Sequence, residues 1–337
     1  MQIVLHPGVW KTGSSAIQMH LRRHHAAYAS AGLAQPAYAL EPGGQHALSD
    51  ALREDDGPAL AGCMADIWAA AATGPRFLLL SSEHLWPLSM ARLQRLARAL
   101  AALGAPVLVR GYVRAQEALW PSVYAQQAKM LHVRADHPLW GSDDYARDGL
   151  VEAFDFDTAF ARFEAVWGRE AVALKVYDRD QLAGRCAATD FLSWLGVPPQ
   201  GLAPVEAREA NPSFGWKGVA FALRLAERLD PEAADGEARA CRQALRRTVR
   251  HMASHKSCAD WLGAAPGLFD PETSAAIRAH YATGNARLAA RHFEGRLLFE
   301  PRPPAPATPP DPARLPKAEL RVAERLFRRL APAGVMP

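Results

Sequence analysis

A loop near the start of the chain combines glycine, lysine and hydroxyl side chains in a spacing that suits a bound anion. Its members are Lys11, Thr12, Gly13, Ser14 and Ser15, and they follow the short apolar segment 2–6. Glycine lets the backbone turn tightly and approach a ligand, while Ser14 and Ser15 can cap the helix expected from about residue 15 to residue 25. A helix N-terminus offers unpaired N–H groups and the positive end of the dipole. The loop therefore predicts a phosphate site to which Lys11 adds a mobile cation.

The order of lysine and glycine separates this loop from the common triphosphate-binding loop. That loop reads G-x-x-x-x-G-K-[ST], with lysine after the second glycine and a hydroxyl for magnesium. In this chain Lys11 precedes Gly13. A nucleotide-dependent kinase therefore stays an alternative that the loop does not favour.

A second candidate phosphate contact follows another apolar segment. Residues 105–113 have the composition of a buried strand, Arg114 comes directly after them, and Ser122 follows eight positions later. A guanidinium matches the geometry of a phosphate, and a hydroxyl two turns along the next helix would add a donor from the same side. The two segments together predict contacts to two phosphates.

Both elements resemble those of sulfotransferases that use 3′-phosphoadenosine 5′-phosphosulfate (PAPS). The K-T-G-S-S string is similar to their 5′-phosphosulfate loop, Arg114 and Ser122 are similar to their 3′-phosphate contacts, and the opening resembles their bacterial branch. The resemblance covers residues 1 to about 300 and includes D-F-L-x-x-L-G at 190–196. It implies an α/β fold of the P-loop-containing sulfotransferase type, with three layers and a central, mainly parallel sheet flanked by helices. It also implies PAPS as co-substrate, 3′-phosphoadenosine 5′-phosphate (PAP) as product, and no metal.

The resemblance further implies roles for single residues. The loop would hold the 5′-phosphosulfate, and Lys11 would follow the charge that grows on the bridging oxygen. Tyr177 matches a tyrosine that approaches the adenine in some relatives, although a core aromatic is the alternative. Trp10 stands where bacterial relatives usually have histidine; it could stack on an acceptor ring or simply pack.

Candidate bases follow the apolar segment 76–82. Glu83 and His84 would emerge at its end, and either type can remove a proton when burial and neighbours tune it. Sulfotransferases acting on glycans and on tyrosine generally use glutamate there, and those acting on small molecules generally use histidine. The S-S-E string favours Glu83 and, through it, a saccharide or glycolipid acceptor; His46 is a weaker candidate for lining the acceptor site.

The distribution of apolar segments predicts the organisation of the chain. Segments 2–6, 76–82, 106–113 and 171–177 are separated by long helical stretches, which favours parallel strands joined by helical crossovers. Ligands then bind beyond the carboxyl ends of the strands. We expect an α/β domain over residues 1–300, a proline-rich linker over 301–315 and an amphipathic helix over 316–331.

Composition sets the remaining limits. The chain has 337 residues, 49% of them hydrophobic and 22% charged, which indicates a globular protein. Its formal charge of +4 suits an anionic cofactor without indicating nucleic-acid binding. No leader or membrane span is visible, so we expect a cytoplasmic enzyme. The basic helical stretches 246–251 and 321–329 favour solvated faces, with contact to an acidic acceptor or a membrane surface as the alternative. A non-catalytic nucleotide-binding module also stays open.

Overall fold

The structure, a computed structural model, describes residues 1–134, 150–197, 213–228, 235–263, 268–300, 308 and 310–331. Packing divides the chain into two compact units. The first comprises residues 1–114, 147–210 and 281–300, and the second comprises residues 115–146, 211–280 and 301–337. This division concerns packing alone, and the domain predicted over residues 1–300 stays a prediction. Residues 301–307 and 309 of the predicted linker lie outside the described residues.

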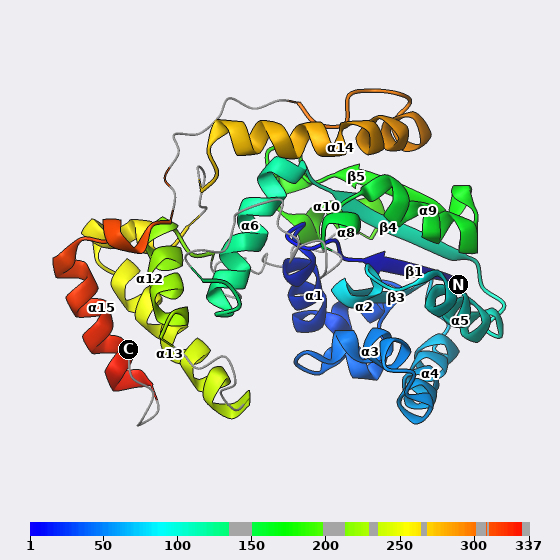
Figure 1. The fold of residues 1–337 in the computed structure, drawn as a ribbon. Coiled ribbons are helices and arrows are strands. Elements are labelled where there is room, and N and C mark those ends of the chain that lie inside the picture. The colour runs from blue at the N-terminus through cyan, green and yellow to red at the C-terminus, as the bar shows by residue number, and fades with distance from the viewer. Residues whose placement is uncertain are drawn as a thin grey trace. The chain divides into compact units, whose positions relative to one another are not determined.

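The first unit is built on a five-stranded parallel sheet, so the predicted α/β class with a mainly parallel sheet is confirmed (Figure 1). The strand order is β2-β3-β1-β4-β5. The strands are β1 (Gln2–Pro7), β2 (Leu33–Ala34), β3 (Phe77–Ser82), β4 (Val107–Val113) and β5 (Val172–Val176). The four longer strands were predicted from their apolar runs. The strand β2 was not predicted, because a strand of two residues shows no periodicity.

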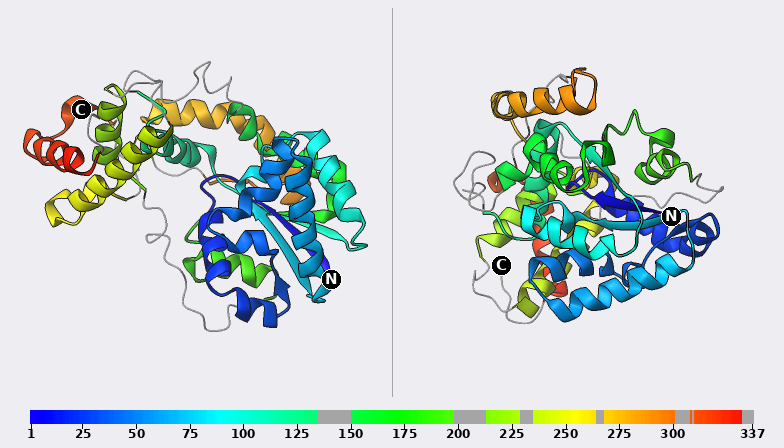
Figure 2. Two further views of the ribbon diagram at one scale, coloured as in Figure 1. Left: turned by 90° about the horizontal axis from the view of Figure 1, so that it is seen from below. Right: turned by 90° about the vertical axis from the view of Figure 1, so that its right-hand side faces the viewer.

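Helices lie on both sides of this sheet (Figure 2). Those of the first unit are α1 (Ser14–Arg23), α2 (His25–Ser30), α3 (Ala47–Arg53), α4 (Gly57–Ala72), α5 (Met90–Ala101), α8 (Leu150–Ala153), α9 (Phe156–Trp167) and α10 (Ala187–Trp194). The long α14 (Pro271–His292) begins in the second unit and enters the first at residue 281.

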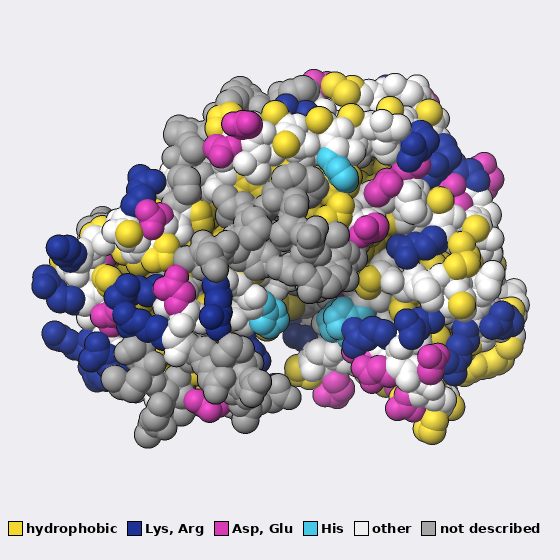
Figure 3. Space-filling view, viewed as in Figure 1, with side chains coloured by type: hydrophobic (Ala, Val, Ile, Leu, Met, Phe, Trp, Pro, Cys, Tyr) yellow, Lys and Arg dark blue, Asp and Glu magenta, His cyan; other side chains and the backbone are white. Residues whose placement is uncertain are grey.

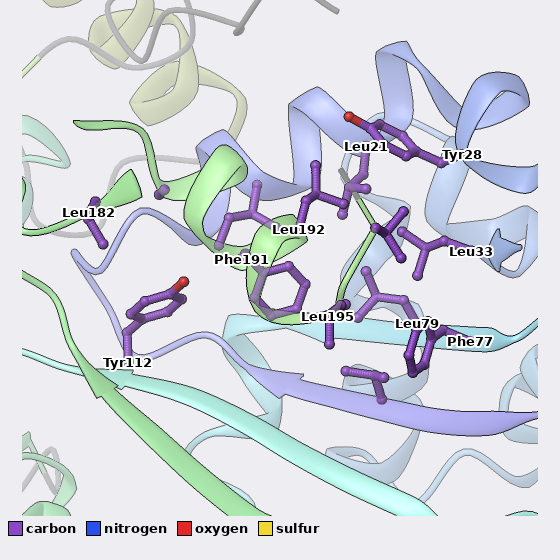
Figure 4. Close-up of a cluster of buried hydrophobic side chains, with 14 residues drawn as sticks. Leu21, Tyr28, Leu33, Phe77, Leu79, Tyr112, Leu182, Phe191, Leu192 and Leu195 are labelled. Carbon is purple, nitrogen blue, oxygen red and sulfur yellow. The ribbon is translucent and has the colours of Figure 1, made fainter. Parts of the chain in front are cut away.

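Apolar packing attaches α1 and α10 to one face of the sheet. Leu21 of α1 and Phe191 of α10 belong to a buried cluster with Leu79 and Tyr112, which come from β3 and β4 (Figure 4). On β4 the next side chain along the strand would point to the opposite face. There Gly111 leaves room for α9, because a Cβ at this position would come within 2.7 Å of the Phe160 ring. The two layers of helices therefore fix the sheet from both sides.

The second unit contains the helices α6 (Gln116–Lys129), α12 (Trp216–Ala226), α13 (Asp235–Ala253) and α15 (Lys317–Leu330). A buried amine attaches α15 to α12. Lys217 Nζ donates to both carboxylate oxygens of Glu319, at 2.8 and 3.0 Å, and lies 3.1 Å from Asp260 Oδ1. Phe327 of α15 is buried beside Phe221 of α12, with ring centroids 6.4 Å apart. The C-terminal helix is therefore an integral part of this unit.

A buried histidine lies near the end of β1, just before the chain reaches the candidate phosphate loop. His6 Nδ1 is 2.8 Å from Ser81 Oγ, which also accepts from Gln18 Nε2 at 3.2 Å. The His6 ring packs 4.8 Å from that of Phe191, and its Nε2 has no hydrogen-bond partner among the described residues. Burial lowers the pKa of His6 to about 4 because the imidazolium would lose its hydration.

The burial of His6 predicts that the protein loses stability in mild acid. The pKa of a histidine in an unfolded chain is about 6.5, so below that pH the unfolded chain binds a proton that the folded chain accepts only near pH 4. The free energy of unfolding should fall by about 3 kcal/mol between pH 6.5 and 4 through this group. Urea denaturation across this window measures the slope in the wild type and in His6→Asn. The exposed His25→Asn is the control and should keep the wild-type slope; equal slopes in all three proteins would refute the assignment.

Candidate active site

The sheet brings the ends of four strands to one edge, and the predicted loop, base and cofactor residues follow those ends. The candidate loop follows β1, Glu83 follows β3, Arg114 follows β4 and Tyr177 follows β5. The register aligns Pro7 with Ser82 and Val113 with Val176. Ligands of parallel α/β sheets bind at this edge.

The loop reaches α1 through two residues with left-handed backbone. Lys11 has φ 63° and Gly13 has φ 83°. A lysine in this region carries local strain, which surrounding structure must maintain. Gly13 is the N-cap of α1, and no side chain caps the helix. The prediction that Ser14 and Ser15 cap the helix is therefore wrong: the helix begins at Ser14, and glycine provides the turn that a capping serine would otherwise make.

The two serine hydroxyls contact Glu83 instead. Ser14 donates a short hydrogen bond to Glu83 Oε1, and Ser15 donates a weaker one of 3.4 Å to the same oxygen. Gly8 makes the close approach possible, because a Cβ there would lie 2.7 Å from Ser14 Cβ and 3.3 Å from Glu83 Cγ. No described residue hydrogen-bonds to Glu83 Oε2, because both serines donate to Oε1. The carboxylate therefore joins the loop to the end of β3.

Two cationic residues, Lys11 and Arg114, interact at the loop. Arg114 donates from Nη1 to the Lys11 carbonyl at 3.0 Å, and its guanidinium lies 6.0 Å from the centre of the Tyr177 ring. Burial lowers the pKa of Lys11; the charge of Glu83 opposes this shift, and that of Arg114 adds to it. Repulsion between two cations is relieved by a ligand that brings negative charge. The N–H groups of Ser14 and Ser15, the first in α1, have no intrahelical acceptor, so they add the donors of a helix N-terminus to the loop.

Thr12 and Tyr177 complete the frame of the loop. Thr12 is buried, and its hydroxyl donates to the Val9 carbonyl at 2.6 Å, so its side chain stabilises the turn. Tyr177 donates its backbone N–H to Val113 at 2.7 Å, and its ring lies where a Cβ on Gly13 would clash at 2.9 Å. The tyrosine predicted to approach adenine is thus beside the loop.

Ser122 belongs to the second unit. It lies on α6, where its hydroxyl donates to the Ala118 carbonyl at 3.3 Å, next to Pro121 within the helix. Arg114 is the last residue of this segment of the first unit. The shared contact of Arg114 and Ser122 with one phosphate stays a prediction.

Trp10 packs within the first unit. Its ring meets that of Phe154 edge-on, with centroids 5.9 Å apart, and it is half-buried. Packing against Phe154 is therefore sufficient to explain a large aromatic side chain at position 10. Stacking on an acceptor ring stays a prediction.

The hydroxyl of Ser82 organises a network of hydrogen bonds at the end of β3. It accepts the backbone N–H of His84 at 3.1 Å and lies 2.9 Å from His46 Nδ1 and 2.8 Å from Ser49 Oγ. Ser49 donates its one hydrogen to the His46 carbonyl at 2.8 Å. Ser82 must then donate to Ser49 and accept from His46, since each hydroxyl has a single hydrogen. His46 is therefore the tautomer with hydrogen on Nδ1.

The surroundings of His46 agree with this assignment. Gln45 Nε2 lies 3.2 Å from His46 Nε2, where an amide hydrogen can meet the bare nitrogen. The His46 ring stacks on His84 with centroids 4.0 Å apart. Burial, followed by the charge of His84, lowers the pKa of His46. His46 is thus a neutral, fixed ring against which His84 lies.

Asp50 orients His84 through its Nδ1 atom. Its Oδ1 lies 2.6 Å from His84 Nδ1, so the imidazole carries hydrogen on Nδ1 and directs Nε2 away from the carboxylate. About one third of each side chain is exposed to solvent, 35% for His84 and 33% for Asp50. The structure therefore brings both predicted bases, Glu83 and His84, to the same strand end with different partners.

Asp50, Ser49 and Ser82 were absent from the sequence-based site. Asp50 lies four residues after His46, a spacing that places two residues on one face of a helix. That signal was present but common. Their link to residues 82–84 depends on how α3 packs near β3, which the spacing does not contain.

Comparisons with known proteins add no identification: no family model matches the chain, and no curated protein matches it. Within the described ranges, no helix combines the length and the apolar character that crossing a membrane requires. Nor do the described residues form a group of three or more His, Cys, Asp or Glu side chains that could hold a metal ion.

The network around Ser82 predicts the tautomer of His46. Imidazole ¹⁵N NMR at pH 7 should find His46 neutral with its hydrogen on Nδ1, because Ser82 accepts that hydrogen and Gln45 donates to Nε2. Ser82→Ala removes the acceptor and should abolish this preference, whereas the exposed Ser193→Ala should keep it. A wild-type spectrum with the hydrogen on Nε2 would overturn the network.

Proposed function

We propose that this protein is a sulfotransferase that moves a sulfuryl group from PAPS to a hydroxyl or amine of an acceptor, with a saccharide favoured. One observation carries the proposal: Lys11, Arg114 and the N-terminus of α1 converge beside Glu83 at the carboxyl edge of a parallel sheet. Such a place attracts a polyanion and provides a base next to it. The sheet, with the loop after its central strand, is also the arrangement expected for a P-loop-containing sulfotransferase fold.

The order of groups in the loop favours a phosphosulfate over a nucleoside triphosphate. Lysine lies before the glycine turn, and the serine hydroxyl that a magnesium ion would need donates to Glu83. In the proposed complex the N–H groups at the start of α1 hold the 5′-phosphate, and Lys11 faces its bridging oxygen. Arg114 holds the 3′-phosphate, with Ser122 as the predicted second donor and Tyr177 beside the adenine.

The transfer itself needs one proton acceptor. The acceptor hydroxyl gives its proton to Glu83 Oε2 as its oxygen forms a bond to sulfur, and the bond from sulfur to the bridging oxygen breaks. The electron pair of that bond stays on the 5′-phosphate, so PAP leaves and a sulfate ester is formed. Catalysis of such a transfer consists mainly of positioning and charge stabilisation.

Binding of PAP tests the cofactor assignment. Isothermal titration should detect PAP without metal, and Lys11→Ala should weaken it about tenfold to a hundredfold, since a charged hydrogen bond is lost. Lys317→Ala removes an exposed lysine of α15 and is the matched control, with affinity unchanged. Binding of ATP with magnesium but not of PAP would favour the kinase. Equal PAP affinity in Lys11→Ala would contradict the loop assignment.

The assignment of the base is tested separately. With radiolabelled PAPS and a panel of acceptors, Glu83→Gln should lower kcat about a hundredfold or more while PAP affinity changes little, because the amide cannot accept the proton. His84→Asn, which keeps a polar side chain beside Asp50, should retain most of the activity. The reverse result would make His84 the base. PAP binding without turnover on any acceptor would indicate a nucleotide-binding module.

A further inference from the structure

The acidic side chains of α15 face the other helices of the second unit and are paired with cations there. Glu319 accepts from Lys217 and from Trp261 Nε1 at 2.6 Å. Glu324 accepts from Arg224 at 3.1 Å and lies 3.7 Å from Arg228. These are the two acids of the helix. Its outward face is therefore left without a carboxylate.

The cations of the same helix all lie on that outward face. We call Lys317, Arg321, Arg325, Arg328 and Arg329 the α15 basic face; each of them is exposed. With 3.6 residues per turn they fall within about 120° of the helix circumference. Arg328 has a distant carboxylate, at 3.9 Å from Glu324, and the other four have none among the described residues. Lys and Arg side chains gather over α15 in the space-filling view (Figure 3).

One exposed apolar side chain flanks these cations. Val322 is 48% exposed and is one of five large apolar side chains exposed in the described part of the chain; it lies about 20° from Arg329 around the helix. The helix buries Ala323 and Phe327 against its own unit, and Leu330 lies on that buried side, so Val322 is the apolar side chain left beside the cations. A polyanion in water gains nothing from such side chains, whereas the interface of a bilayer takes up both cations and apolar groups.

We propose that the α15 basic face docks this protein on an anionic lipid bilayer as a peripheral contact. Each lysine or arginine near an anionic surface contributes roughly 1 kcal/mol to binding. The α15 basic face brings five such cations to one surface. Val322 enters the headgroup region beside them. The surface belongs to the second unit, and the proposal is independent of the sulfuryl transfer proposed above.

Vesicle co-sedimentation tests the proposal with the full chain. The protein should bind vesicles containing 30% phosphatidylglycerol, bind pure phosphatidylcholine much less, and lose binding as salt rises. Arg321→Gln with Arg325→Gln should weaken binding about thirtyfold, the effect of two cations at roughly 1 kcal/mol each. The control, Arg98→Gln with Arg179→Gln, removes two exposed arginines of the first unit and should bind as the wild type does.

Val322→Ser distinguishes a bilayer from other anionic partners. It should weaken vesicle binding severalfold without changing affinity for heparin, because only the bilayer contacts the apolar group. Circular dichroism and thermal unfolding confirm that these exposed substitutions leave the fold intact. Equal binding by the arginine variant and its control, or vesicle binding that Val322→Ser leaves unchanged, would overturn the proposal. PAP affinity, measured in parallel, reports separately on the cofactor site.

Discussion

The parallel register of β1, β3, β4 and β5 is the constraint on which the candidate site depends. Because these four strands are neighbours that point the same way, the segments that follow them meet at one edge. Hydrogen bonds then join the segments: Ser14 binds Glu83, and Arg114 binds the Lys11 carbonyl. A shift in register by one residue would reverse which face each side chain reaches. The helices packed on both faces prevent that shift.

Burial and neighbouring charges act in opposite directions on the Lys11 cation at this edge of the sheet. Lys11 and Arg114 repel each other, and removal from water makes the lysine cation less favourable, while Glu83 compensates in part. The strained backbone of Lys11 persists because the loop is held at both ends. Lys11 and the N-terminus of α1 thus prepare this edge for an anion before any ligand arrives. This preparation supports the proposed role in transfer of a charged group.

Hydrogen-bond networks give neighbouring side chains different environments. Ser82 fixes His46 in one tautomer, and Asp50 fixes the orientation of His84, so two stacked imidazoles have different environments. In the second unit the buried Lys217 gathers Glu319 and Asp260 in the same way. This ion pairing also affects the surface of the second unit: because the acidic side chains of α15 face inward, its cations face outward. A buried amine thus determines the character of an exposed face.

Local patterns of residues were sufficient to predict the parallel α/β class and the four longer strands, because short β-branched and apolar runs between helical stretches leave few other arrangements. They also singled out Lys11, Arg114, Glu83 and His84, whose residue types and places after strands are local properties. Three features became visible in the folded chain: the serine hydroxyls of the loop bind Glu83 rather than cap the helix, Asp50 and Ser82 hold the imidazoles, and Ser122 belongs to another unit. Those contacts join residues far apart in the chain, and their formation depends on register and helix packing, which no local pattern of residues encodes.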